Sequence, residues 1–142
     1  MSTEQNKAIV RRWVEGGWNQ GNLNLVDELY AADYVLHDAN GDVRGQEGFK
    51  QYVTMYRTAF PDLSFTIEDM VAEGDQVAWR ITATGTHKGT LMGIPPTGRS
   101  IAVTAIIISR FVGGKWAEDW VNVDTLGMLQ QLGVIPAPGQ AS

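Results

Sequence analysis

Asp119, a carboxylate near the end of the chain, is the residue best suited to acid/base chemistry. It lies in the run 115–123, which is typical of a strand, two residues before Val121, so both side chains share one face. An apolar pocket disfavours the charged form of a carboxylate, which brings its pKa toward neutrality and makes it a useful base or acid. The alternative is a hydrogen-bonded or outward-facing aspartate beside Glu118.

The turn at Gly113-Gly114 decides what surrounds Asp119. With a three-residue loop, Asp119 shares its face with four apolar residues of the predicted hairpin. These are Ala105, Ile107, Val121 and Val123. A two-residue loop brings the other face of the partner strand to this side, because side chains alternate along a strand. The placement of Asp119 therefore depends on the loop.

Three further polar residues are candidates, and each has a structural alternative. Asp124 stands at a strand-to-helix junction, where it either caps the helix or takes part in chemistry. His87 could polarise a substrate carbonyl at the mouth of a pocket, or tie down the glycine-rich segment 85–98 by a hydrogen bond. His37 either lines the cavity or bonds to Asp38 as a loop histidine.

Aromatic residues on the predicted helices and strands could shape a cavity for a small, mostly apolar molecule. The set is Trp13, Trp18, Tyr52, Tyr56 and Trp79. Tyrosine hydroxyls in such a cavity would orient a ligand. The alternative is that these side chains only fill the core, because helical stripes are more often plain core.

Three helical segments fill the first third of the chain. Ser2 and Gln5 form a capping-box pattern at the first. Asn22 can cap the second, and the third follows Gly45 and ends before Phe60-Pro61.

Strand patterns dominate from residue 63 onward. Strands are expected at 63–71, 76–84, 100–112 and 115–123, after an earlier extended piece at 34–37, and a short helix follows residue 124. Helices followed by an antiparallel meander predict an α+β fold, with a curved antiparallel sheet wrapped around the N-terminal helices. Such a cone can hold a pocket. We expect one domain over residues 1–135 and a flexible tail over 136–142.

Composition excludes several classes of function. The chain of 142 residues has no cysteine, which rules out disulfides and thiolate chemistry and is compatible with the cytoplasm. Two histidines leave little for a metal site, and no phosphate-binding or other cofactor motif is found, so no metal or cofactor is expected. The 11 basic residues are scattered among 16 acidic ones, which argues against nucleic-acid binding. No apolar run suggests a signal peptide or a membrane span, so a soluble protein is expected.

The strand around Ile101–Ile108 is apolar on both faces. In a sheet with one face exposed to solvent, apolar and polar residues should alternate along each strand instead. One face must meet the helices, and a second copy of the chain is the simplest cover for the other. We therefore expect a homodimer joined through the outer face of the sheet.

Three segments carry a resemblance to a known family. They are Trp18-Asn19-Gln-Gly21, then Gly85-Thr-His87-Lys-Gly89 with Gly93-Ile-Pro95-Pro96-Thr97, and finally Asp124 to Gly133. On these motifs the chain resembles the SnoaL-like polyketide (ester) cyclases. The resemblance implies the cone-shaped fold of nuclear transport factors, ketosteroid isomerases and scytalone dehydratases, usually as a dimer. It also implies intramolecular aldol ring closure without cofactor, with an aspartate as acid/base.

The sequence departs from the cyclases at their chemical centre. On the resemblance, their aspartate position is occupied by Val121 and two helper positions by Ala105 and Ile107. Val121 and Ile107 should then face a more apolar pocket, while many relatives carry histidine at position 119. Three interpretations remain: a cofactor-independent cyclase or isomerase acting on a hydrophobic carbonyl compound, a non-catalytic binder of a hydrophobic metabolite, or a protein-interaction domain with a filled cone.

Overall fold

Six strands form one mixed sheet in the order β2-β1-β6-β5-β4-β3. The structure, a computed structural model, describes residues 2–136 and 139. The strands are β1 (Tyr30–Asp38), β2 (Gly41–Arg44), β3 (Ser64–Glu73), β4 (Gln76–Thr86), β5 (Ser100–Val112) and β6 (Lys115–Val123). Neighbours are antiparallel except β1 and β6, which run parallel. The α+β class is confirmed, but the sheet is mixed rather than wholly antiparallel.

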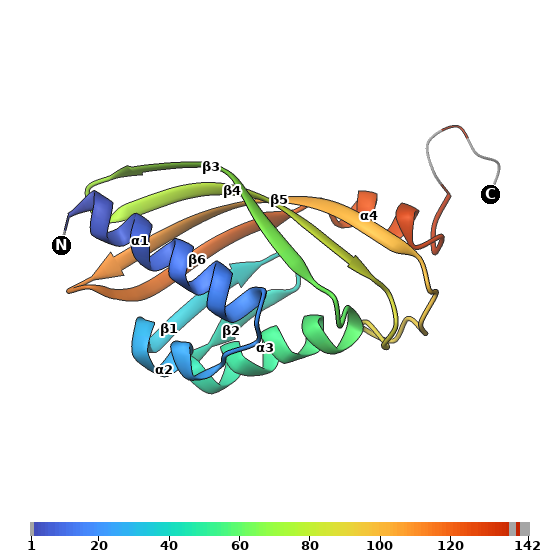
Figure 1. Cartoon of the computed structure of the whole chain (residues 1–142), viewed down its shortest axis with the longest axis horizontal. Coiled ribbons are helices and arrows are strands. Elements are labelled where there is room, and N and C mark those ends of the chain that lie inside the picture. Colours follow the sequence, from blue (N-terminus) through green and yellow to red (C-terminus); the bar gives the residue numbers. More distant parts are fainter. Residues whose placement is uncertain (1, 137–138, 140–142) are drawn as a thin grey trace.

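The long strands curve over the helices of the first half of the chain, whereas the last helix lies beside β5 at the other end of the sheet (Figure 1). The helices are α1 (Thr3–Trp13), continued by the π-helical turn η1 (Val14–Trp18), α2 (Asn24–Leu29), α3 (Gly45–Ala59) and α4 (Thr125–Gln131). Helix α1 packs on β3 and β4, α3 packs on β1 and β2, and α4 contacts β5. Within residues 2–136 and 139, none of these helices has the length and apolarity needed to cross a bilayer.

The predicted capping box starts α1. The Ser2 hydroxyl accepts a bond from the Gln5 backbone N–H, and the Gln5 side chain accepts one from the Ser2 N–H. The helix then buries Trp13, whose ring centroid lies 5.4 Å from those of both Tyr30 and Phe49. Burying a large apolar side chain contributes roughly 1.5–3 kcal/mol, so this cluster joins α1, β1 and α3 into one core.

The hairpin between β5 and β6 has a two-residue turn and a bulge. Gly113 and Gly114 both have positive φ (55° and 81°), as the tight turns that match strand twist require. The register then shifts by one residue between Arg110 and Phe111, which leaves Ala117 as the extra residue of β6. Of the two loop lengths considered from the sequence, the chain has the two-residue loop, yet the bulge restores the alternation that a three-residue loop would have given.

As a result, Asp119 lies on the inner face of the sheet. It pairs with Ser109, while Val121 pairs with Ile107 and Val123 with Ala105. Asp119 therefore shares its face with the apolar residues that a three-residue loop would have given it, although the bulge and not the loop produces this grouping.

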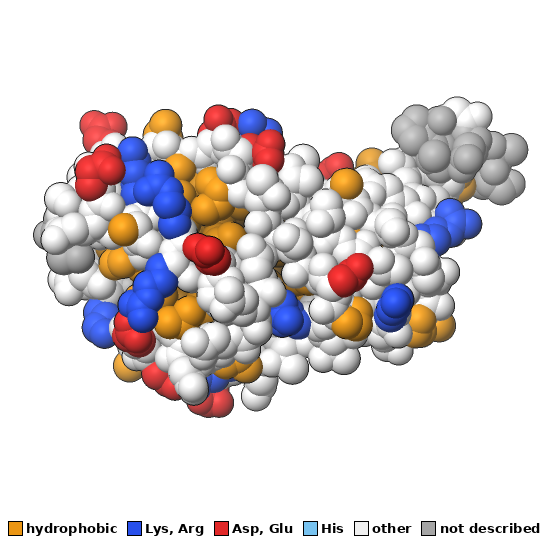
Figure 2. All heavy atoms as spheres, viewed as in Figure 1, with side chains coloured by type: hydrophobic (Ala, Val, Ile, Leu, Met, Phe, Trp, Pro, Cys, Tyr) orange, Lys and Arg blue, Asp and Glu red, His pale blue; other side chains and the backbone are white. Residues whose placement is uncertain are grey.

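The outer face of the sheet carries large apolar side chains that remain exposed. Ile106 is 54% exposed, Ile108 41% and Trp120 38%. On the face seen in Figure 2, Lys and Arg side chains are interspersed with Asp and Glu. The predicted tail falls mostly on residues 137–138 and 140–142, which lie outside the described residues.

Candidate active site

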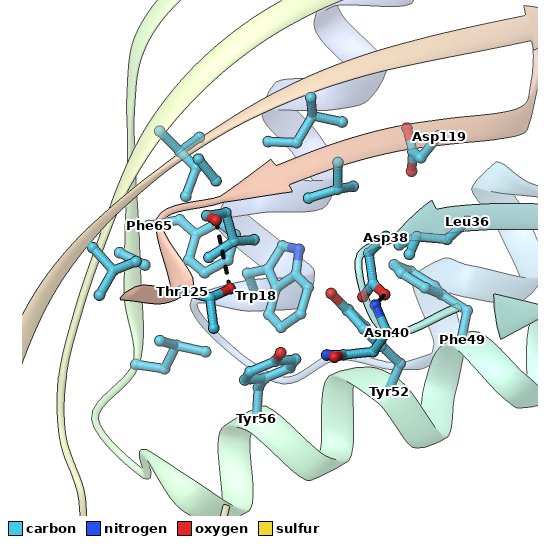
Figure 3. A pocket seen from close by; sticks show the side chains of 18 of the residues that line it. Trp18, Leu36, Asp38, Asn40, Phe49, Tyr52, Tyr56, Phe65, Asp119 and Thr125 are labelled. Atoms are coloured by element: carbon cyan, nitrogen blue, oxygen red, sulfur yellow. Dashed lines mark hydrogen bonds between the residues drawn. The ribbon is translucent and has the colours of Figure 1, made fainter. Parts of the chain in front are cut away.

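A cavity of about 120 Å³ lies between the inner face of the sheet and the helices (Figure 3). A single water needs roughly 10–15 Å³ by such a measure, so the cavity can take a small organic molecule. Many of the residues expected at the site line it: Asp119, Trp18, Tyr52, Tyr56, Trp79, Ile107 and Val121, together with Trp13. The open cavity contradicts the interpretation as a protein-interaction domain with a filled cone.

Asp119 is a buried carboxylate at one end of this cavity, with 3% of its surface exposed. Its Oδ2 accepts a bond from the Tyr34 hydroxyl at 2.5 Å. Its Oδ1 accepts from the Ser109 hydroxyl at 2.5 Å and from the Trp116 indole N–H at 2.8 Å. The Trp79 indole in turn donates to Ser109 at 2.9 Å. Side chains from the four strands β1, β4, β5 and β6 thus fix the orientation of this carboxyl group.

Burial raises the pKa of Asp119 to about 6, against the opposing effect of the hydrogen bonds from Ser109, Tyr34 and Trp116. Removal from water penalises the ionised form, and three donors recover only part of that cost. Both protonation states are therefore populated near neutral pH. This is the condition under which one carboxyl group can both take up and release a proton.

Tyr30 and Tyr34 stand next to this carboxyl group, their rings 4.7 Å apart. Burial, and after it the charge of Asp119, raise the pKa of both phenols well above the usual value. Both hydroxyls therefore remain protonated donors. The Tyr30 hydroxyl is buried and has no hydrogen-bond partner among the described residues, and Tyr30 lines the cavity. Its hydroxyl is thus a donor that none of the described residues uses.

A second polar group lies elsewhere on the cavity wall. Asp38, Asn40, Tyr52 and Tyr56 line the cavity together, and Figure 3 shows the Asp38 carboxylate next to Asn40 and Tyr52. The Asn40 backbone N–H donates to Asp38 Oδ1 at 2.8 Å. Burial, and after it Tyr56 and Asp38, raise the pKa of Tyr52 well above its usual value. Sequence reasoning did not select Asp38 as a site residue.

The matching family model, described as SnoaL-like polyketide cyclase, covers residues 8–132. The chain belongs to the SnoaL-like polyketide cyclase family. It is 35% identical over 139 residues to the aklanonic acid methyl ester cyclase DnrD of Streptomyces peucetius, covering 94% of this chain and 92% of that one. It is 34% identical over 121 residues to the nogalonic acid methyl ester cyclase of Streptomyces nogalater, covering 82% and 89%.

A solved structure confirms the fold expected of a cyclase of this family. A protein from Catenulispora acidiphila with a ketosteroid isomerase-like fold superposes with a TM-score of 0.76 at 24% identity. The match covers 94% of this chain and 97% of that one. The cone-shaped α+β fold implied by the sequence motifs is therefore confirmed.

Two of the candidate residues, Asp124 and His87, do not line the cavity, and each makes hydrogen bonds that stabilise the fold. Asp124 accepts a bond from the Gly127 backbone N–H at 3.0 Å and caps α4. His87 is fully buried, and its Nδ1 accepts a bond from the Thr97 N–H at 3.2 Å. The His87 ring therefore ties down the glycine-rich segment, which was one of its two expected roles.

His37 lies on the outer face of the sheet, which corrects the expectation that it lines the cavity. Its ring stacks on Trp120 at 5.7 Å, and its two nitrogens contact Asp42 at 2.8 Å and Glu118 at 2.6 Å. The hydrogen bonds to Glu118 and Asp42 raise the pKa of His37. The alternation of β1 explains the placement, because Tyr34 and Leu36 face inward. The same alternation puts Asp38, and not His37, on the cavity side.

Proposed function

We propose that the protein closes a ring in a neutral polyketide ester by intramolecular aldol addition, using its own side chains as acid and base. The observation that carries this proposal is Asp119, a carboxyl group with a pKa of about 6 at one end of an apolar cavity. The relatives named above act, by their names, on the methyl esters of aklanonic and nogalonic acids. A related ester with a reactive carbonyl is the substrate class we propose here.

The reaction needs two proton transfers and no exchange of atoms with another molecule. A base removes a proton from the carbon next to a carbonyl, and the resulting enolate attacks a second carbonyl carbon of the same substrate. One carbon–carbon bond forms, and the oxygen of the attacked carbonyl takes up a proton. The product is an isomer of the substrate. Positioned proton transfer typically contributes about 10²–10⁴-fold to the rate.

Tyr30 supplies a donor for the negative charge that develops on oxygen during this step. Its hydroxyl is protonated, buried and without a partner among the described residues, close to Asp119. A donor held in place in a water-poor site stabilises an oxyanion more than a mobile water does, because it needs no reorganisation during the reaction. The cavity thus offers a proton-transfer group and an oxyanion donor together.

The charges of the cavity favour an ester over the free acid. Its lining, within the part of the chain that the structure describes, includes the carboxyl groups of Asp38 and Asp119 and no Lys, Arg or His. A substrate carboxylate would meet like charge without a compensating cation, which is unfavourable in an apolar site. A methyl ester removes this charge while keeping the carbonyl groups.

A second candidate function is non-catalytic binding of a hydrophobic metabolite. The observation in its favour is Val121, an apolar residue that lines the cavity where the resemblance places the aspartate of the cyclases. The two functions differ in one measurable way. A binder retains the ester unchanged, whereas a cyclase releases an isomer.

The test is incubation of the purified protein with the methyl esters of aklanonic and nogalonic acids. We expect a product of unchanged mass with a new chromatographic retention and one carbonyl fewer, and no conversion of the free acids. The Glu118→Gln protein, changed at the neighbouring outer-face residue, serves as a positive control. Ester that is bound but recovered unchanged would favour the binding function.

We further propose that two copies pair through the outer face of the sheet. The exposed Ile106, Ile108 and Trp120 lie on adjacent strands of that face. Exposed apolar side chains gathered on one surface are typical of a protein interface. The same residue types in the second copy would cover them symmetrically.

A further inference from the structure

A carboxylate lies beside the valine that replaces the aspartate of the cyclases. Strands β1 and β6 run parallel, with Leu36 paired to Asp119 and His37 paired to Trp120. The paired residues end there, and extending the register by one residue would bring Asp38 beside Val121, since paired strands lie roughly 4.8 Å apart. Both residues line the cavity, so their side chains share its inner face. The carboxylate missing from β6 is thus present on the neighbouring strand.

The surroundings of Asp38 hold it in position and leave it open to the cavity. Its Oδ1 accepts the Asn40 backbone N–H at 2.8 Å, in the tight turn between β1 and β2. Figure 3 shows the carboxylate turned toward the space that Tyr52 and Tyr56 also face. Asp119, by contrast, accepts three side-chain hydrogen bonds. Of the two carboxyl groups, Asp38 therefore accepts fewer hydrogen bonds from the described residues.

We propose that Asp38 is the base that removes the carbon-bound proton, in place of the aspartate that the cyclases carry on β6. The inference rests on the proposed ring closure. The C–H bond breaks and its proton passes to an Asp38 oxygen, while the electron pair forms the new carbon–carbon bond. The π electrons of the attacked carbonyl move to its oxygen, which takes a proton from Asp119. The proton on Asp38 then returns to Asp119 through water, and both groups are restored.

Tyr52 and Tyr56 have a supporting role in this arrangement. Burial first, and then the charge of Asp38, raise the pKa of Tyr56, and the phenol of Tyr52 is shifted the same way. Both phenols therefore remain donors that can hold the carbonyl next to the acidic C–H bond. A carbonyl that accepts these hydrogen bonds makes the neighbouring C–H bond more acidic. Val121 presents only methyl groups at the position where the cyclases carry a carboxylate.

The experiment separates proton removal from ring closure. In heavy water, the substrate ester exchanges its acidic C–H proton for deuterium when a base acts, whether or not the ring closes. We expect Asp38→Asn to lower both exchange and closure by about 10²–10⁴-fold. Asp119→Asn should lower closure while exchange persists. Asp33→Asn, the same change at an exposed position of the same strand, should leave both rates unchanged.

A relocation variant gives the sharper test. In the Asp38→Asn, Val121→Asp double variant, the carboxylate returns to β6, and we expect at least about a tenfold recovery of exchange over Asp38→Asn. Circular dichroism and thermal melts confirm that each variant is folded. Full-rate exchange in a folded Asp38→Asn protein would overturn the assignment of Asp38 while leaving the cyclase function intact. A wild-type protein that neither exchanges nor closes the ester would overturn both.

Discussion

Ionisation of Asp119 should make folding stability depend on pH in a predictable direction. Its pKa of about 6 in the folded protein lies above the ordinary value of 3.8. A raised carboxyl pKa contributes stability that is fully present below the unfolded pKa and is lost as pH rises through the folded pKa. The full difference corresponds to about 3 kcal/mol, since each pKa unit is worth about 1.4 kcal/mol.

Comparison with Asp119→Asn isolates this contribution, because the amide does not titrate. Between about pH 4.5 and pH 7.5, wild type should lose about 2 kcal/mol of unfolding free energy relative to the variant. Any loss of hydrogen bonds in the variant lowers its unfolding free energy by the same amount at every pH. The dependence of the difference on pH is therefore unaffected. Urea denaturation followed by tryptophan fluorescence measures both proteins across this range.

Glu118→Gln is the matched control, since its carboxylate neighbours Asp119 but lies on the outer face. Hydrogen bonds from His37 and Arg110 lower the pKa of Glu118, so its contribution is present at neutral pH and is lost as pH falls. As pH rises, the unfolding free energy of wild type should therefore fall relative to that of Asp119→Asn and rise relative to that of Glu118→Gln. A difference between wild type and Asp119→Asn that stays constant with pH would mean that Asp119 ionises like an ordinary exposed carboxyl, and the acid/base argument would fail.

Three further outcomes follow from the same contacts. Val121→Asp should lower the unfolding free energy by roughly 1–3 kcal/mol if the new carboxyl finds no partner, measured by thermal melts, and an unchanged melt would contradict a dry cavity. Tyr34→Phe removes a hydrogen bond that lowers the pKa of Asp119. The limb of the pH–rate profile that reports Asp119 should therefore move to higher pH. If this limb does not move, it belongs to another group. Light scattering at micromolar concentration should show a dimer that Ile106→Glu weakens, whereas a wild-type monomer would contradict pairing through the outer face.

The sequence predicts much of this fold because its signals are local. The capping box of α1, the glycine turn at Gly113 and the alternation along β5 each depend on neighbouring residues. Alternation also predicted that Asp119 and Val121 share a face, but the partner-strand residues they meet depend on the bulge at Ala117, which was not foreseen. A bulge is a single extra residue without a distinctive composition, so its effect on register appears only in the paired strands.

The site was harder to predict because its parts come together from distant segments. Tyr34 and Ser109 reach Asp119 from two other strands, and no spacing along the chain relates them. Asp38 enters the site through the parallel pairing of β1 with β6, two segments far apart in the sequence. Alternation from Tyr34 was the one local signal that could have separated Asp38 from its neighbour His37.

The most direct test of the account is the turnover of Asp119→Asn on an ester that wild type converts. Asparagine keeps the shape of the side chain and removes the titrating group, so the rate of ring closure should fall by about 10²–10⁴-fold while the ester still binds. Glu118→Gln should retain the wild-type rate. Full-rate ring closure by a folded Asp119→Asn protein would contradict the assignment of Asp119 as a proton-transfer group.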